Sequence, residues 1–87
     1  MIDVEIVWSR IKHREGEVFY QIRGKEFTYT ITGNYLNPPT NRKIPKSNFK
    51  EALKLLPLSG TTKIHHLQGP SYIYAILMDK RIRQDDW

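Results

Sequence analysis

The residues best suited to chemistry in this chain are cations in a stretch that contains no acid. Residues 40–48 read Thr-Asn-Arg-Lys-Ile-Pro-Lys-Ser-Asn and lead into a predicted helix. Backbone N–H groups at a helix N-terminus favour a phosphate, and lysine or arginine adds charge-assisted hydrogen bonds. The pattern predicts a surface that holds a nucleic-acid backbone without reading its bases. The residues expected to hold phosphates are Arg42, Lys43, Lys46 and Ser47 in this stretch and Lys50 just beyond it.

A second phosphate contact is predicted at a hairpin tip, where Arg23 and Lys25 flank Gly24. Bases of a single strand stack on exposed aromatic rings, and Tyr20 and Tyr35 are the tyrosines least committed to the core. The hypothesis requires that cations distant along the chain gather on one positive surface after folding.

Other kinds of chemistry find less support in the sequence. Ser71 lacks the flanking glycine of a nucleophile elbow, and no phosphate-binding loop or zinc-protease motif occurs. His65 and His66 are adjacent, so on an extended segment they point to opposite faces and do not share one ion. We therefore predict no catalytic residue, no metal site and no cofactor, and we do not expect an enzyme.

Composition indicates a small basic globular domain. The chain has 87 residues, 14 Lys and Arg against 9 Asp and Glu, a net charge of +5 and no Cys. We predict one domain over residues 1–84 and a polar tail over residues 85–87. No apolar run could span a membrane, and Asp3 and Glu5 occupy positions where a signal peptide carries positive charge. A cytoplasmic chain without membrane contact is expected.

The N-terminal segment fits two interpretations. Ile2, Val4, Ile6 and Trp8 alternate as in a strand, whereas Val4, Val7, Trp8 and Ile11 follow the spacing of one helical face. We favour the helix, because Asp3 is a good N-cap, the last turn is basic, and Gly16 can end it.

The middle of the chain predicts a three-stranded antiparallel meander. The expected strands are residues 18–22, 27–32 and 35–36, which are rich in aromatic and β-branched side chains. Gly24 and the pair Gly33-Asn34 supply the turns, and Pro38 ends the third strand.

Two helices are expected after the strands, over residues 47–56 and 70–82. Ser47 is the predicted N-cap of the first helix and Pro70 the first residue of the second. The fold class is therefore α+β, with an N-terminal helix and with two C-terminal helices packed on one face of the sheet. The predicted core comprises Val7, Trp8, Ile11, Phe19, Phe27, Tyr29, Ile31, Phe49, Leu53, Leu56, Ile73, Ile76 and Leu77.

A protein partner is the main alternative to DNA or RNA. A basic stretch can equally bind an acidic protein, and a net charge of this size is also common for solubility alone. Trp87, Tyr35 and Leu36, together with a free sheet edge, would favour a protein-interaction module or a homodimer if they were exposed.

From Trp8 through Ile82 the chain resembles small uncharacterised bacterial proteins. The segments that carry the resemblance are Trp8 with Ile11, Gly16–Phe19, Arg23–Lys25 with Phe27–Tyr29, Ile44–Ser47 with Phe49, and Gly69–Tyr72. The resemblance implies a freestanding bacterial domain, but it implies no activity and no site residue.

Overall fold

The computed structural model describes residues 2–87. The first element is a helix, α1 (Val4–His13). Asp3 precedes it in an extended conformation, and its side chain accepts a hydrogen bond from the Glu5 N–H at 2.8 Å. This contact satisfies one of the free donors at the helix start. The helical interpretation of the first segment is confirmed, and the strand alternative is wrong. The face buried by α1 comprises Val7, Trp8 and Ile11.

The strands form two small antiparallel sheets. One is a hairpin of β1 (Phe19–Tyr20) and β2 (Glu26–Phe27). The other has the order β3 (Thr30–Thr32), β4 (Tyr35–Asn37), β5 (Ile44–Pro45). Leu36 of β4 lies opposite both Ile31 and Ile44, and the predicted turn at Gly33-Asn34 joins β3 to β4. The α+β class is confirmed.

The three-stranded meander consists of β3, β4 and β5 and not of the three strands that the sequence predicted. The predicted strand over residues 27–32 divides at Tyr29. The Tyr29 hydroxyl donates to the Ile11 carbonyl at 2.5 Å, and the Tyr29 carbonyl accepts the Gly16 N–H at 3.0 Å. These bonds tie the chain to the end of α1, so β2 and β3 belong to separate sheets. The strand β5 was not predicted, because its two residues stand in an otherwise polar stretch.

The first predicted C-terminal helix is shorter than expected. It is α2 (Lys46–Leu53), which ends three residues before Leu56. Leu56 precedes Pro57, and the residue before a proline disfavours the helical conformation. A short 3₁₀ helix, η1 (Thr62–Ile64), follows in the next loop.

The second predicted C-terminal helix is broken into α3 (Pro70–Leu77) and α4 (Lys80–Arg83). Asp79 between them is extended, and its carboxylate accepts the Arg81 N–H at 2.9 Å, so it begins a new helix. Pro70 occupies the first turn of α3, as predicted. Within residues 2–87 no helix combines the length and the apolar character that crossing a membrane requires.

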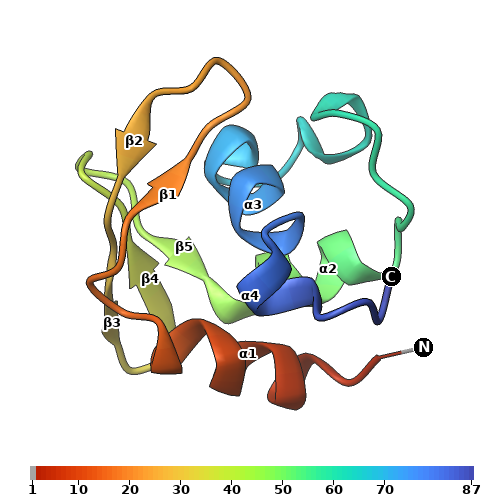
Figure 1. Ribbon diagram of the computed structural model, residues 1–87, viewed down its shortest axis with the longest axis horizontal. Coiled ribbons are helices and arrows are strands. Elements are labelled where there is room, and N and C mark those ends of the chain that lie inside the picture. The colour runs from red at the N-terminus through yellow and green to blue at the C-terminus, as the bar shows by residue number, and fades with distance from the viewer. Residues whose placement is uncertain (1) are drawn as a thin grey trace.

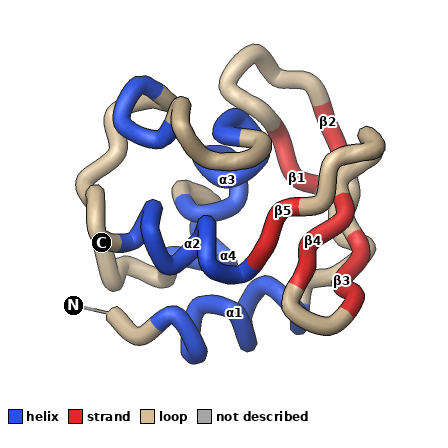
Figure 2. The backbone as a smooth tube through the Cα atoms, turned by 180° about the vertical axis from the view of Figure 1, so that it is seen from behind, coloured by secondary structure: helices blue, strands red, loops and turns tan. Residues whose placement is uncertain are grey.

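The strands lie on one side of the molecule, α2, α3 and α4 lie on the other, and α1 runs across one end (Figure 1 and Figure 2). Aromatic contacts join these parts: the Trp8 and Phe49 ring centroids are 5.7 Å apart, and those of Phe27 and Tyr72 are 4.9 Å apart. Eleven of the predicted core residues are buried, whereas Ile31 and Leu56 are only partly buried. The buried hydrophobic residues that the predicted core did not include are Leu36, Ile44, Ala52, Leu58, Ile64, Ala75 and Ile82.

The last residues contact the rest of the domain. The Trp87 indole N–H donates to the Leu77 carbonyl at 2.8 Å, and the Asp86 carboxylate lies 2.6 Å from the Arg10 guanidinium. The side chain of Trp87 is therefore packed at the end of α3 and is partly buried.

Candidate nucleic-acid interface

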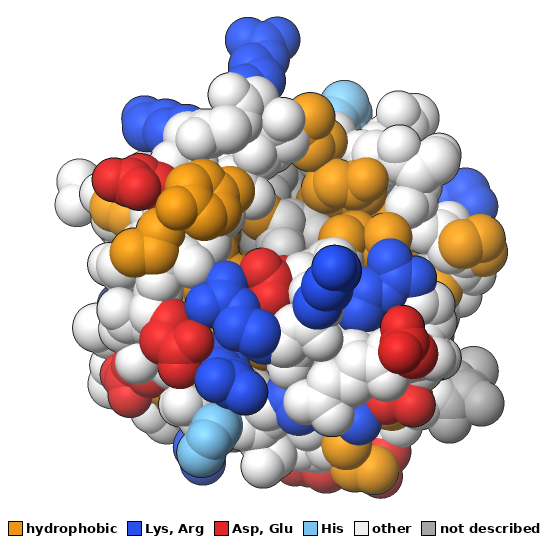
Figure 3. Space-filling model, in the orientation of Figure 1, with side chains coloured by type: hydrophobic (Ala, Val, Ile, Leu, Met, Phe, Trp, Pro, Cys, Tyr) orange, Lys and Arg blue, Asp and Glu red, His pale blue; other side chains and the backbone are white. Residues whose placement is uncertain are grey.

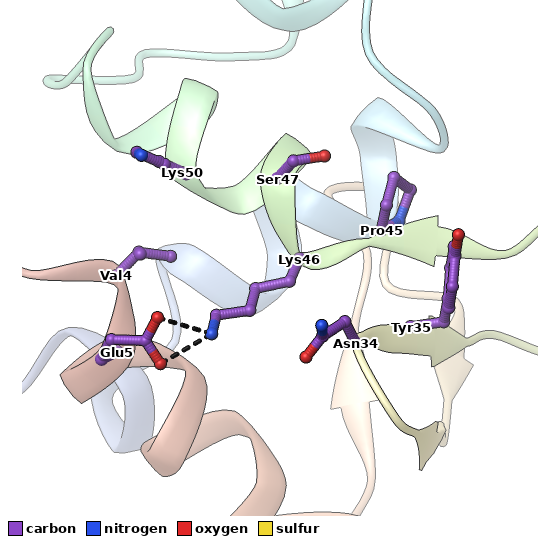
Figure 4. A pocket seen from close by; sticks show the side chains of 8 residues that line it. All are labelled: Val4, Glu5, Asn34, Tyr35, Pro45, Lys46, Ser47 and Lys50. Carbon is purple, nitrogen blue, oxygen red and sulfur yellow. Dashed lines mark hydrogen bonds and ion pairs between the residues drawn. The ribbon is translucent and has the colours of Figure 1, made fainter.

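A groove lies where the start of α1, the β3–β4 turn and the first turns of α2 meet. Its volume is about 410 Å³. The residues that line it are Val4, Glu5, Asn34, Tyr35, Pro45, Lys46, Ser47 and Lys50 (Figure 4). Three of the predicted phosphate-holding residues, Lys46, Ser47 and Lys50, are among them.

The backbone places Tyr35 beside the start of α2. Pro45 pairs with Tyr35 in the sheet, and the Lys46 N–H donates to the Asn34 carbonyl at 2.8 Å. Strand β5 runs directly into the helix, so the sheet register fixes where the first helical side chains point. The prediction that Ser47 is the N-cap is wrong: Pro45 takes that position, and no side chain caps the helix. Ser47 lies in the first turn with an exposed side chain.

An ion pair crosses the groove. The Lys46 ammonium lies 2.6 Å from both carboxylate oxygens of Glu5, which belongs to α1 (Figure 4). The Glu5 side chain is 68% exposed, whereas that of Lys46 is 20% exposed. An ion pair with one partner in water contributes only about 0–1 kcal/mol. An anionic ligand can therefore replace Glu5 at the Lys46 ammonium at small cost.

An aromatic ring and two further cations flank this ion pair. Tyr35 is 47% exposed and stands at one end of the groove (Figure 4). The Lys43 ammonium lies 6.0 Å from its ring centroid, at the outer limit of a cation–π contact. Lys50 stands at the other end of the groove. Among the described residues, neither Lys43 nor Lys50 has a carboxylate within ion-pair distance.

The remaining predicted site residues lie outside the groove. Arg42 lines a different hollow, at the start of α3 beside Ser71. Arg23 and Lys25 are at the tip of the β1–β2 hairpin, which points away from the end covered by α1 (Figure 1). The chain thus places Lys46, Ser47 and Lys50 in one groove, with Lys43 beside Tyr35, and does not join them to the other three residues.

The Arg81 side chain makes its contacts within the folded domain. Arg81 donates to Asp79 at 2.8 Å, to Glu17 at 3.0 Å and to the Val18 carbonyl at 2.8 Å. Its guanidinium also lies 3.9 Å from the centroid of the Phe19 ring. The hydrogen bonds from Arg81 hold the pKa of the Asp79 carboxyl below its usual value, against the opposing effect of burial. This guanidinium is therefore not free to bind a ligand.

The face drawn in Figure 3 mixes both signs of charge. Lys and Arg side chains near its centre stand beside Asp and Glu side chains. Two further arginines of α1 and its end are paired: Arg10 with Asp86, and Arg14 with Glu17 at 3.5 Å. This arrangement favours a structural role for these arginines over a binding role.

Several residues of the groove carry no signal in the sequence. Glu5 is 41 positions from Lys46, so only the packing of α1 on α2 brings them together. Tyr35 could be identified from the sequence as an aromatic residue at a strand end, but the sequence marked Asn34 only as a turn residue.

Over residues 2–87 no three His, Cys, Asp or Glu side chains gather as metal ligands. His65 lies 3.3 Å from the Thr61 hydroxyl.

A scan against protein-family models gives no match, and searches of curated proteins and of solved structures find no similar chain. The bacterial origin and the family suggested by the sequence therefore stay predictions.

Proposed function

We propose that this chain binds the phosphate backbone of a nucleic acid through the groove between α1, β4 and α2. The observation that carries the proposal is a groove lined by an exposed aromatic ring, Tyr35, and by Lys46 and Lys50, with the Lys43 ammonium 6.0 Å from the centroid of that ring. These residues come from a strand end, a loop and a helix, so the positive groove exists only in the folded chain. No residue in a catalytic role is part of this proposal.

Electrostatics supplies most of the binding in this proposal. Lys43 and Lys50 can each contact a phosphate directly, and Lys46 exchanges the Glu5 carboxylate for a phosphate oxygen. Each phosphate contact releases counterions, so for a single strand the logarithm of the affinity falls with the logarithm of salt concentration by about 0.7 per contact. Three contacts give a slope near −2 by the same rule. A cytoplasmic location, where DNA and RNA are accessible, belongs to the same proposal.

A triple substitution tests the role of the groove. K43Q/K46Q/K50Q removes the ammonium groups of Lys46 and Lys50 in the groove and of Lys43 beside Tyr35. We expect its affinity for a fluorescent oligonucleotide to fall at least tenfold at low salt. The matched control K12Q/K63Q/K80Q removes three exposed lysines outside the groove that also lack a carboxylate partner among the described residues. Fluorescence anisotropy across a salt series gives both affinity and slope.

Two results of this experiment would reject the proposal. The first is no measurable binding of DNA or RNA by the natural sequence at low salt. The second is an equal loss of affinity in both triple variants, because overall charge and not the groove would then control binding.

An exposed apolar patch on the hairpin favours a protein partner as the second candidate. Val18, Tyr20 and Ile22 are 41%, 59% and 63% exposed, and hydrophobic side chains are visible on the face drawn in Figure 3. The earlier grounds for this candidate are partly wrong, because Leu36 is fully buried and Trp87 is partly buried. Sedimentation velocity of the natural chain and of Y20S/I22S tests it: a dimer present only in the former supports self-association, and two monomers reject it.

A further inference from the structure

The positive groove continues along α2 beyond the residues described above. An adjoining hollow of about 290 Å³ shares Val4, Glu5 and Lys50 with the groove. Its other lining residues are Ile2, Asp3, Leu53 and Lys54. Together the two hollows form one track from Tyr35, past the first turn of α2, to the end of that helix.

The cations on this track repeat regularly. Lys46 and Lys50 of α2 and Lys54, the C-cap residue that follows it, are four residues apart, so they lie on one side of the helix and are separated by about 6 Å along its axis. The phosphates of an extended single strand repeat on a comparable length. Lys54 contacts Glu51 at 3.4 Å with both side chains about half exposed, an ion pair that a phosphate can replace.

Acidic side chains border this row of lysines. Asp3 and Glu5 lie on the α1 side of the track, and Glu51 lies on α2 beside Lys54. A duplex presents two rows of phosphates, and its second row would meet these carboxylates, which repel it. One strand places a single row of phosphates on the lysines, and it meets Glu5 and Glu51 only where a phosphate displaces them from Lys46 and Lys54.

The aromatic ring gives a second, independent reason for one strand. Tyr35 is at the end of the track where Lys43 also lies, and its ring is exposed. A base can stack on this ring only when it is unpaired, since paired bases are covered by their neighbours. Every base has a flat face, so stacking selects for unpaired bases without selecting a sequence.

We propose that the ligand is single-stranded, with its backbone along Lys46, Lys50 and Lys54 and one base stacked on Tyr35. This inference rests on the proposed function and narrows it from nucleic acid in general to a single strand. Because Lys43 is beside the ring, it contacts the phosphate next to the stacked base.

The experiment compares a fluorescent mixed-sequence oligonucleotide with the same strand annealed to its complement, by anisotropy, at equal salt and well below the melting temperature of the duplex. We expect at least tenfold tighter binding of the single strand. Y35A should lower the single-strand affinity about tenfold, whereas Y35F, which keeps the ring face, should leave it nearly unchanged. K54Q should weaken binding several-fold and reduce the salt slope by about 0.7, and the matched variant K63Q should do neither.

The outcomes separate this inference from the proposed function. Equal or tighter binding of the duplex, with loss in K43Q/K46Q/K50Q, overturns the single-strand inference and leaves backbone binding standing. No loss in Y35A, in a variant whose circular dichroism and melting match the natural chain, overturns the stacking contact. Absence of binding to either nucleic acid overturns both proposals, and equal binding of polyglutamate shows a site for any polyanion and also overturns both.

Discussion

The cations of this small domain fall into two regions that differ in what holds them. Around Arg81, one guanidinium makes hydrogen bonds to two carboxylates and a backbone carbonyl and packs on an aromatic ring. Along the groove, Lys46 has one exposed partner, and Lys43 and Lys50 have none among the described residues. A positive charge in the sequence therefore does not by itself mark a binding residue, because the number and burial of its partners decide whether a cation is available.

The largest effect is expected from Arg81→Ala. This change removes all contacts of the guanidinium, so Asp79 keeps only the backbone N–H of residue 81 and Glu17 keeps only Arg14 at 3.5 Å. Hydrogen bonds to charged groups contribute about 1.5–3 kcal/mol each at most, and partial exposure lowers the sum, so we expect a loss of about 3 kcal/mol in unfolding free energy. Urea denaturation followed by circular dichroism measures it.

Two observations make the Arg81 result specific. Arg81→Lys keeps the charge but loses the planar fork, so it should recover only part of the lost stability. Folded R81A at low temperature should bind an oligonucleotide as the natural chain does. A clear loss of affinity in the folded variant would place Arg81 in the binding surface and would break the division into two regions.

Acid should weaken the Arg81 region by an intermediate amount. Hydrogen bonds from Arg81 lower the pKa of the Asp79 carboxyl in the folded chain. The resulting stabilisation is complete above the unfolded-state pKa of about 3.9 and is lost as pH falls through the lower folded-state pKa. Asp79→Asn should cost about 1–2 kcal/mol at pH 6, and its difference from the natural chain should shrink as the pH is lowered below 4. Urea midpoints across this pH range test the prediction, and a difference independent of pH contradicts it.

The smallest effect on stability is expected from Glu5→Gln in the groove. The Glu5–Lys46 pair is exposed on the carboxylate side, so its loss should change the unfolding free energy by less than about 1 kcal/mol. The affinity for an oligonucleotide should instead rise several-fold, because the internal competitor for the Lys46 ammonium is gone. Glu15→Gln outside the groove is the matched control, and equal affinity gains in both variants would show only the effect of net charge.

Local signals in the sequence predict the elements whose ends are set by neighbouring residues. Asp3 as N-cap and Pro70 in a first turn locate α1 and α3, and Gly33-Asn34 locates the β3–β4 turn. Each of these features depends on backbone preferences within a few residues. The one local signal that was overlooked is Asp79, an N-cap residue that separates α3 from α4.

Contacts between distant segments are what the sequence could not supply. The Tyr29 hydroxyl finds the Ile11 carbonyl 18 residues away, and that contact divides a run that reads as one strand. The basic stretch was correctly expected to lead into the start of a helix. That Tyr35 lies beside it, and that Glu5 pairs with Lys46, depends on how α1 and β4 pack around α2. The separation of Arg23 and Lys25 from the groove has the same origin.

The most direct test of the division between structural and binding cations is a titration of the ¹⁵N-labelled chain with a single-stranded oligonucleotide, followed by two-dimensional NMR. We predict that amide shifts change at residues 34–35 and 43–54 and at Glu5, while those of residues 17–19 and 79–81 stay in place. Shift changes centred on residues 17–19 and 79–81, or none at all at low salt, would contradict the account.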